Sequence, residues 1–362
     1  MVSPRITSRK TDHIKICASK NVESERTNGL EDVLLVHRSA PEIDMENVDT
    51  TFSFMGHRLS FPFIIEAITG GTSHARRINQ RLAEAAENLQ VAMGVGSQRI
   101  ALEDPAFEPS FRIAREVAPS AFLIANIGAP QLSMGYGVDE AKRVVEMISA
   151  NALAIHLNAV QESVQPEGET VAMGVIQKID KITKEVGVPV IVKETGAGIS
   201  AEEARRFKEV GVSGVDIAGV GGTDWARVED YRNRHERSGQ GMAPFHGWGI
   251  STAASLVEVV QSTGLTAIAS GGIRNGLQIA KSIALGASAA GLARPLLSPA
   301  LTTTQAVKNV IQAIHRELKT TMFLTGSKTV ADLQKTPLVI VGNTYHWLTQ
   351  RGFDTTRYAR RN

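Results

Sequence analysis

Short apolar runs that alternate with amphipathic segments constrain the fold of this chain more than any other feature. From residue 61 onward the runs are too brief for helices, and the segments between them carry apolar residues at helical spacing. The runs are continuously apolar, as is typical of parallel strands buried on both faces. We predict strands at 63–67, 90–95, 122–126, 152–157, 190–194, 214–217, 266–270 and 288–292. Helices are predicted at 75–88, 106–117, 139–150, 174–186, 201–210, 252–263 and 275–285, with a final one at 303–318. This alternation predicts an α/β fold, a (β/α)8 TIM barrel, and an open doubly wound sheet is the main alternative.

Two parts of the chain fall outside the alternation. Residues 1–60 are predicted to form an N-terminal arm and a hairpin, centred on Met55-Gly56, that plugs the barrel. Residues 1–30 are polar, and they fit either a solvated tail or an arm that folds over a site for a polyanion. Residues 61–362 would form the barrel, with a lid-like insertion at 225–248 after the sixth strand.

Composition excludes several classes of protein. The chain has 362 residues, 43% of them hydrophobic, and a formal net charge of +2, so it carries no nucleic-acid footprint. Its single cysteine, Cys17, excludes an internal disulfide and a cysteine-built zinc site. No run is long and apolar enough for a membrane helix, and the N-terminus lacks a signal-peptide core. We expect a cytoplasmic protein with neither a nucleic-acid nor a membrane partner.

Glycines and hydrogen-bonding side chains follow almost every predicted strand, where a barrel places its site. Small residues around the mouth suit a flat heterocycle, and Thr69, Ser97 and Asn126 could bond the polar edges of a flavin. Lys193 could lie near the N1–C2 edge of that flavin, or it could simply pair with Glu194.

The turn after the seventh strand is predicted to bind phosphate. Gly271-Gly272 ends this strand and precedes a helix, so backbone N–H groups can approach an anion closely. Thr223, Gly272 and Arg274 could therefore hold a flavin phosphate.

A tight polar cluster follows the fourth strand, made of His156, Asn158, Gln161 and Glu162. The cluster has too few ligands for a metal cage built by protein alone, but Glu162 could hold Mg²⁺ if substrate phosphates supplied the other oxygens. Arg99, with Arg9 and Lys10 of the arm, could grip such phosphates.

In combination these motifs resemble, over nearly the full length, the type 2 isopentenyl-diphosphate Δ-isomerases, which depend on FMN. The residues that carry the resemblance are Arg9-Lys10, His13-Ile14, Thr69-Gly70-Gly71, Gly96-Ser97-Gln98-Arg99, Ala125-Asn126-Ile127-Gly128, His156-Leu157-Asn158, Gln161-Glu162, Val192-Lys193-Glu194, Gly221-Gly222-Thr223, Trp225 and Ser270-Gly271-Gly272-Ile273-Arg274. The sequence departs from the family pattern at Ala218, where a flavin-contacting serine is expected.

The resemblance implies interconversion of isopentenyl and dimethylallyl diphosphate without net redox change, by a homo-oligomer that is commonly a tetramer. It also implies reduced FMN, Mg²⁺ and NAD(P)H as the reductant. Carried over by position, the FMN contacts are Ala67, Ile68, Thr69, Ser97, Asn126, Lys193, Thr223, Gly272, Ile273, Arg274, Ala293 and Arg294. The substrate contacts are Arg9, Lys10, Ser97, Gln98, Arg99 and Gln161, and the Mg²⁺ ligand is Glu162.

Our mechanistic hypothesis makes the flavin the acid and base, because ordinary side chains protonate an unactivated alkene poorly. Gln161 is the side chain expected to relay a proton, supported by His156 and Asn158, while Lys193 tunes the flavin. Trp225 could shield a developing cation or could merely anchor the lid. The alternative functions are an FMN oxidoreductase and a non-catalytic flavin- or phosphate-binding protein.

Overall fold

The computed structural model describes residues 4–233 and 242–361, so residues 234–241 of the predicted lid lie outside the described part. Its centre is a closed barrel of parallel strands in the order β10-β11-β4-β5-β6-β7-β8-β9. The strands are β4 (Phe63–Ile65), β5 (Ala92–Gly94), β6 (Leu123–Gly128), β7 (Ala152–His156), β8 (Val190–Lys193), β9 (Gly214–Asp216), β10 (Thr266–Ala269) and β11 (Ala289–Leu292).

Pairing between the last and first strands closes the barrel, with Ala290 opposite Phe63. The predicted barrel is therefore confirmed, and the open sheet is wrong. Most strands end one or two residues earlier than predicted. The backbone N–H groups of Glu66, Leu157 and Glu194, each directly beyond a strand, still donate to the neighbouring strand, and the chain then enters the loops at the mouth.

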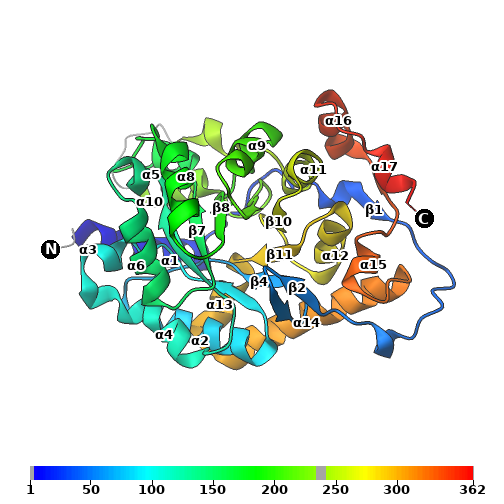
Figure 1. Cartoon of the computed structure of the whole chain (residues 1–362), viewed down its shortest axis with the longest axis horizontal. Coiled ribbons are helices and arrows are strands. Elements are labelled where there is room, and N and C mark those ends of the chain that lie inside the picture. Colours follow the sequence, from blue (N-terminus) through cyan, green and yellow to red (C-terminus); the bar gives the residue numbers. More distant parts are fainter. Residues whose placement is uncertain (1–3, 234–241, 362) are drawn as a thin grey trace.

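Helices surround the barrel on all sides (Figure 1). The main ones are α2 (Ser73–Leu89), α4 (Pro109–Val117), α6 (Val138–Met147), α8 (Val175–Glu185), α9 (Ala201–Glu209), α11 (Thr252–Thr263), α12 (Gly276–Leu285) and α14 (Thr304–Leu324). Shorter ones are α3 (Arg99–Glu103), α5 (Ala129–Ser133), α7 (Ala159–Val164), α10 (Trp225–Asn233), α13 (Arg294–Thr302), α15 (Val330–Leu333), α16 (Gly342–Gln350) and α17 (Thr356–Ala359). None in the described ranges is long and apolar enough to cross a membrane.

The hairpin of β2 (Phe52–Phe54) and β3 (His57–Leu59) closes one end of the barrel. Its turn at Met55 and Gly56 has positive φ values of 46° and 85°. Phe54 and Leu59 are buried among apolar side chains from inside the barrel, and the Phe54 and Phe122 rings meet edge to face with centroids 5.2 Å apart. The hairpin thus supplies core packing at the end opposite the strand C-termini.

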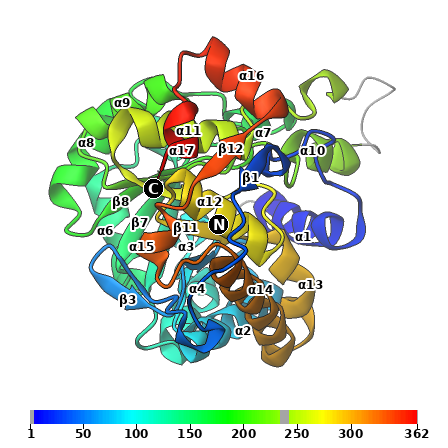
Figure 2. The same cartoon turned by 90° about the vertical axis from the view of Figure 1, so that its right-hand side faces the viewer.

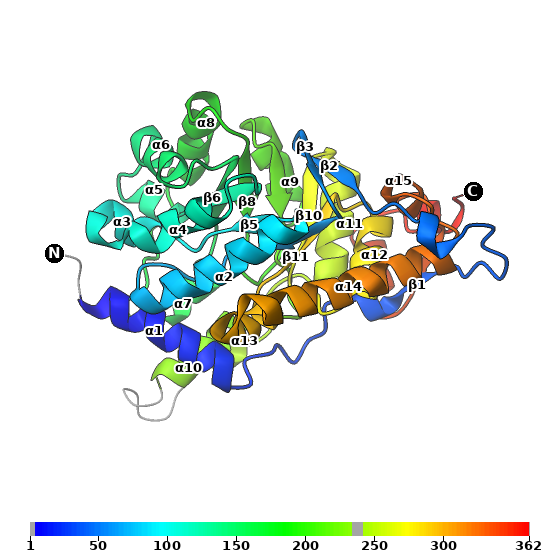
Figure 3. The same cartoon turned by 90° about the horizontal axis from the view of Figure 1, so that it is seen from below.

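The N-terminal segment is not a solvated tail. It forms α1 (Pro4–Ser19), which lies against α10 and α13 (Figure 3). Ile14 is buried in the main core, and Cys17 packs against that core. Burial of this apolar edge holds the helix across the mouth of the barrel.

A two-stranded sheet outside the barrel joins distant parts of the chain. In it β1 (Val33–Leu35) pairs antiparallel with β12 (Leu338–Ile340), and the two lie side by side in Figure 2. The sequence patterns predicted the first strand within the arm and hairpin region, but its partner only as part of a closing tail.

Candidate active site

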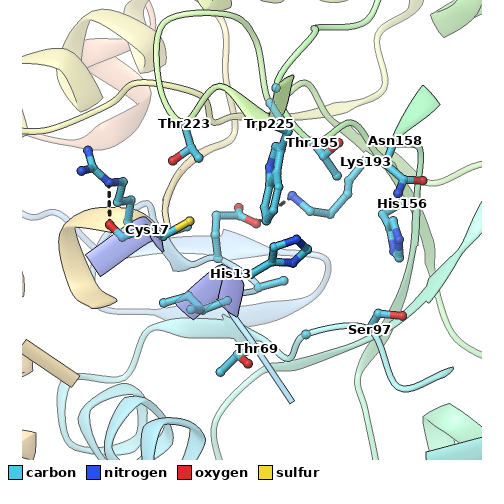
Figure 4. A pocket seen from close by; sticks show the side chains of 18 of the residues that line it. His13, Cys17, Thr69, Ser97, His156, Asn158, Lys193, Thr195, Thr223 and Trp225 are labelled. Carbon is cyan, nitrogen blue, oxygen red and sulfur yellow. Dashed lines mark hydrogen bonds and ion pairs between the residues drawn. The ribbon is translucent and has the colours of Figure 1, made fainter. Parts of the chain in front are cut away.

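A cavity of about 300 Å³ opens at the C-terminal ends of the strands, and α1 forms part of its wall (Figure 4). All of the predicted FMN-binding positions line it, as do the predicted catalytic residues and Glu162. The predicted substrate residues Arg9, Lys10, Ser97, Arg99 and Gln161 line it as well. Strand ends and arm therefore converge on one chamber.

Gln98 is the exception among the predicted site residues. Its side chain is completely buried behind the wall, where Nε2 donates to the carbonyl of Val144 at 2.9 Å. Its Oε1 accepts from the backbone N–H of Asn126 at 2.9 Å. The structure thus corrects its assignment as a substrate contact: Gln98 braces the end of β6, because it starts α3 with its side chain turned toward α6.

Glycines bring the loops after β9 and β10 into backbone contact. Gly272 has φ +75°, and a Cβ there would lie 2.2 Å from the carbonyl oxygen of Gly221. A Cβ on Gly222 would lie 2.5 Å from the nitrogen of Gly272. Close packing between loops therefore requires these glycines, quite apart from any ligand.

The same loops leave donors free for an anion. In the described chain, the backbone N–H groups of Gly272, Ile273, Ala293 and Arg294 donate to no protein acceptor. Ile273 is buried, and an unpaired buried N–H is unfavourable unless a ligand satisfies it. This donor set fits the phosphate of FMN, as expected between the last two strands of a barrel.

Glu23 occupies the side chains of both arginines at this position, which no local sequence pattern indicated. Arg274 Nη2 donates to its two carboxylate oxygens at 2.8 and 2.7 Å, and Arg294 Nη1 also donates to it. Arg294 further donates to the carbonyls of Cys17 and Lys20 at the end of α1, each at 3.1 Å. The arginines therefore join the arm to the phosphate loops.

Lys193 makes ion pairs, but not with Glu194. Its Nζ lies 2.6 Å from Asp216 Oδ2 and 3.1 Å from Glu66 Oε2. Burial alone would lower the pKa of Lys193, but these two carboxylates outweigh burial and raise it. Burial and the neighbouring Asp216 raise the pKa of Glu66 to about 7. Glu194 instead accepts from the three backbone N–H groups of residues 195–197 at 2.6–2.7 Å.

His156 is a neutral imidazole in this environment. Burial, together with the nearby Lys193 ammonium, lowers its pKa to about 4. Its Nδ1 lies 2.8 Å from Asn126 Oδ1, so Nδ1 carries the proton and donates. His156 can therefore orient or accept, but it is no cationic acid at neutral pH.

The residues around Glu162 supply some, but not all, of the oxygen ligands that a hard cation such as Mg²⁺ needs. Asn158 Nδ2 donates to Glu162 Oε1 at 2.7 Å, and Gln165 Nε2 donates to Oε2 at 2.5 Å. Asn158 Oδ1 is buried without a partner. No group of three or more His, Cys, Asp or Glu residues in the described ranges could hold a metal. Glu162 with Asn158 Oδ1 suits Mg²⁺ if a ligand supplies further oxygens.

Cationic side chains gather on the arm side of the cavity. Lys10 Nζ donates to the Ser97 carbonyl at 3.1 Å, and Arg99 pairs with Glu103 and Glu169 at 2.7 Å each. Burial and the adjacent Arg9 and Arg99 lower the pKa of Lys10 to about 7. A polyanion entering here would relieve this mutual repulsion.

The arm is also fastened to the segment after the sixth strand. His13 Nε2 lies 2.8 Å from Glu229 Oε1, and the His13 and Trp225 rings meet edge to face at 5.2 Å. Trp225 both lines the cavity and packs on the arm, so its position suits either of the roles considered for it. Glu66 lines the cavity, while Asp216 and Glu229 pair with the lining residues Lys193 and His13. Sequence reasoning assigned no role to any of the three.

Comparisons with known proteins agree with this architecture. The model of the FMN-dependent dehydrogenase family matches residues 129–340. A lactate oxidase structure from Pediococcus acidilactici, described as putative, superimposes with a TM-score of 0.64, covering 91% of this chain and 87% of that one. At 14% identity this likeness shows the fold alone.

Sequence relatives are much nearer. The isopentenyl-diphosphate delta-isomerase of Methanothermobacter thermautotrophicus is 48% identical over 356 residues, covering 98% of this chain and 99% of the relative. That of Pyrococcus furiosus is 46% identical and covers 96% of this chain and 90% of the relative. The chain therefore belongs to the FMN-dependent isopentenyl-diphosphate delta-isomerase family.

Proposed function

We propose that this protein interconverts isopentenyl diphosphate and dimethylallyl diphosphate without net redox change. The observation that carries the proposal is that two ligand sites share one cavity. Unpaired backbone N–H groups suit the FMN phosphate, and the cations of α1 and α3 suit a diphosphate. The polar cluster after β7 lies along the same wall, so an alkene tail would meet it.

The residues divide the work by position. Arg9, Lys10 and Arg99 would bind the diphosphate and thereby fix the alkene in the chamber. Gln161 would relay a proton, since its amide can both donate and accept, and Asn158, whose Nδ2 lies 3.5 Å from Gln161 Oε1, would orient it. Neutral His156, held by Asn126, would support the relay from the same cavity. Trp225, packed on His13, would exclude water.

Reduced FMN, when bound, would supply a nitrogen-borne proton and an electron-rich ring beside the alkene. Lys193 would face its N1–C2 edge, and backbone donors at 272–273 and 293–294 would hold its phosphate. Ala218 lines the cavity and offers only backbone atoms in place of a serine hydroxyl. Glu162 would hold Mg²⁺ against the diphosphate. NAD(P)H as reductant and a homotetramer complete the proposal, on the resemblance to the family.

The FMN-dependent dehydrogenase match keeps an oxidoreductase as the second candidate. A hydroxy-acid oxidase would use a histidine–arginine pair near β9, and residues 219–223 contain neither. A nucleophilic cysteine could only be Cys17, which does line the cavity. Burial raises the pKa of this thiol to about 11, so it stays protonated and a poor nucleophile.

An anaerobic experiment separates the candidates. Protein with FMN, Mg²⁺ and reductant is mixed with isopentenyl diphosphate in D₂O, and products are followed by NMR. Deuterated dimethylallyl diphosphate, formed without reductant use beyond priming, is the expected result. Gln161→Ala should lower this activity at least 100-fold, as expected for a lost acid–base group. Gln305→Ala, at an exposed position of α14 outside the cavity, should retain it. If product forms in proportion to the reductant consumed, the protein is an oxidoreductase. If FMN binds but no deuterium enters isopentenyl diphosphate or its product, the protein does not catalyse isomerisation of this substrate.

A further inference from the structure

Three ionisable side chains meet beside the cavity, where Lys193 extends inward (Figure 4). Glu66 and Lys193 line the cavity, and Asp216 pairs with Lys193 from outside its lining. They come from the ends of three different strands, β4, β8 and β9. Their side chains are only 10%, 11% and 3% exposed for Glu66, Lys193 and Asp216. Because little water screens these side chains, each charge strongly affects the others and any bound ligand.

Neighbouring groups fix both carboxylates. Ser270 Oγ donates to Asp216 Oδ1 at 2.5 Å, leaving Oδ2 for the Lys193 ammonium at 2.6 Å. Glu66 rests against Gly291, where an added Cβ would lie 2.0 Å from Glu66 Oε1. These contacts hold both carboxylates beside the ammonium, so we expect them to set its position.

The charges also cancel in part. One ammonium faces Asp216 at 2.6 Å and Glu66 at 3.1 Å, so the cluster offers a flavin much less than a full positive charge. A positive charge near the N1–C2 edge favours the reduced, anionic cofactor over the oxidised one, and carboxylates behind it weaken that preference.

We propose that Asp216 and Glu66 are positioning residues that hold Lys193 and offset its charge, and so limit how strongly the site prefers reduced over oxidised FMN. This inference rests on the FMN site of the proposed function. A partly neutralised ammonium suits a site whose cofactor must keep a proton to transfer, since a bare ammonium would favour losing it.

The test is the reduction potential of bound FMN, measured by equilibration with a reference dye. Asp216→Asn keeps the shape and removes one negative charge. In this variant the ratio of the affinity for reduced FMN to the affinity for oxidised FMN should rise at least tenfold. This corresponds to a rise of about 30 mV in the two-electron reduction potential of bound FMN. Glu66→Gln should shift the potential in the same direction by less, and Lys193→Met should shift it the opposite way.

Glu258→Gln is the matched control, because Glu258 is equally buried but pairs with Arg351 outside the cavity. Its potential should equal that of the unmodified protein. The inference is overturned if Asp216→Asn and Glu66→Gln weaken both forms of FMN equally and leave the potential unchanged, as purely structural residues would. If Asp216→Asn does not fold, the Glu66→Gln potential decides alone. The measurement needs only bound FMN, so it stands even if isopentenyl diphosphate proves not to be the substrate.

Discussion

Diphosphate binding should weaken steeply above neutral pH because of Lys10. The free site lowers the pKa of this ammonium to about 7, through burial and the neighbouring Arg9 and Arg99. A bound diphosphate contacts the charged form only, so binding raises this pKa back toward its ordinary range. The group is therefore charged in the complex but increasingly neutral in the free protein as pH rises above 7, and affinity falls with it.

The size of the effect follows from proton linkage. If the complex keeps Lys10 charged, the dissociation constant rises about tenfold by pH 8 and about 100-fold by pH 9, or about 1.4 kcal/mol per pH unit. Well below pH 7 Lys10 is charged in both the free protein and the complex, so its contribution is constant there. Arginine stays charged throughout this range, so Lys10→Arg should flatten the profile.

Calorimetric titration of FMN-loaded protein with inorganic diphosphate and Mg²⁺, from pH 6.5 to 9, measures both affinity and proton uptake. Repeating it in buffers of different ionisation enthalpy should show close to one proton taken up at pH 8.5. Equal losses of affinity in the native protein and Lys10→Arg would assign the pH dependence to the ligand itself. A native profile that is flat between pH 7 and 9 would refute the reasoning.

Three further perturbations test the architecture. Glu23→Gln frees the guanidiniums at the phosphate loops and should tighten FMN binding several-fold in a fluorescence titration; weaker binding would show instead that Glu23 orients them. Gly272→Ala places a Cβ 2.2 Å from the Gly221 carbonyl oxygen at a residue with φ +75°. It should lower the free energy of unfolding by about 1–3 kcal/mol and abolish FMN binding. Retained affinity for FMN would contradict this. Phe54→Ala removes a buried ring from the barrel plug and should lower the free energy of unfolding in urea by about 3–5 kcal/mol, whereas a loss below 1 kcal/mol would mean that the hairpin is not core.

Local patterns predicted most of the barrel. Each strand and helix leaves its own periodic signature within a few residues, and parallel strands in sequence close in only a few ways. Because a barrel places its site at the C-terminal ends of its strands, the predicted strand ends also predicted that residues such as Asn126, Thr223 and Gly272 line the cavity. Composition left residues 1–30 as either a solvated tail or an arm over a polyanion site, and the resemblance to a family favoured the arm, with Arg9 and Lys10 as substrate contacts.

Pairing across long separations was decided only by the tertiary structure. Lys193 meets Glu66 across 127 positions and Arg274 meets Glu23 across 251, and nothing near either residue encodes the partner. Gln98 lies between Ser97 and Arg99, which line the cavity, yet its own side chain turns to the Val144 carbonyl of α6, and no local pattern distinguishes it from its neighbours. The sequence by itself therefore determined the barrel and the edge on which its site lies, since both follow from local periodicity and topology. Which charges neutralise one another inside that site depended on the closure of the barrel, because closure alone brings β4, β8 and β9 to one point.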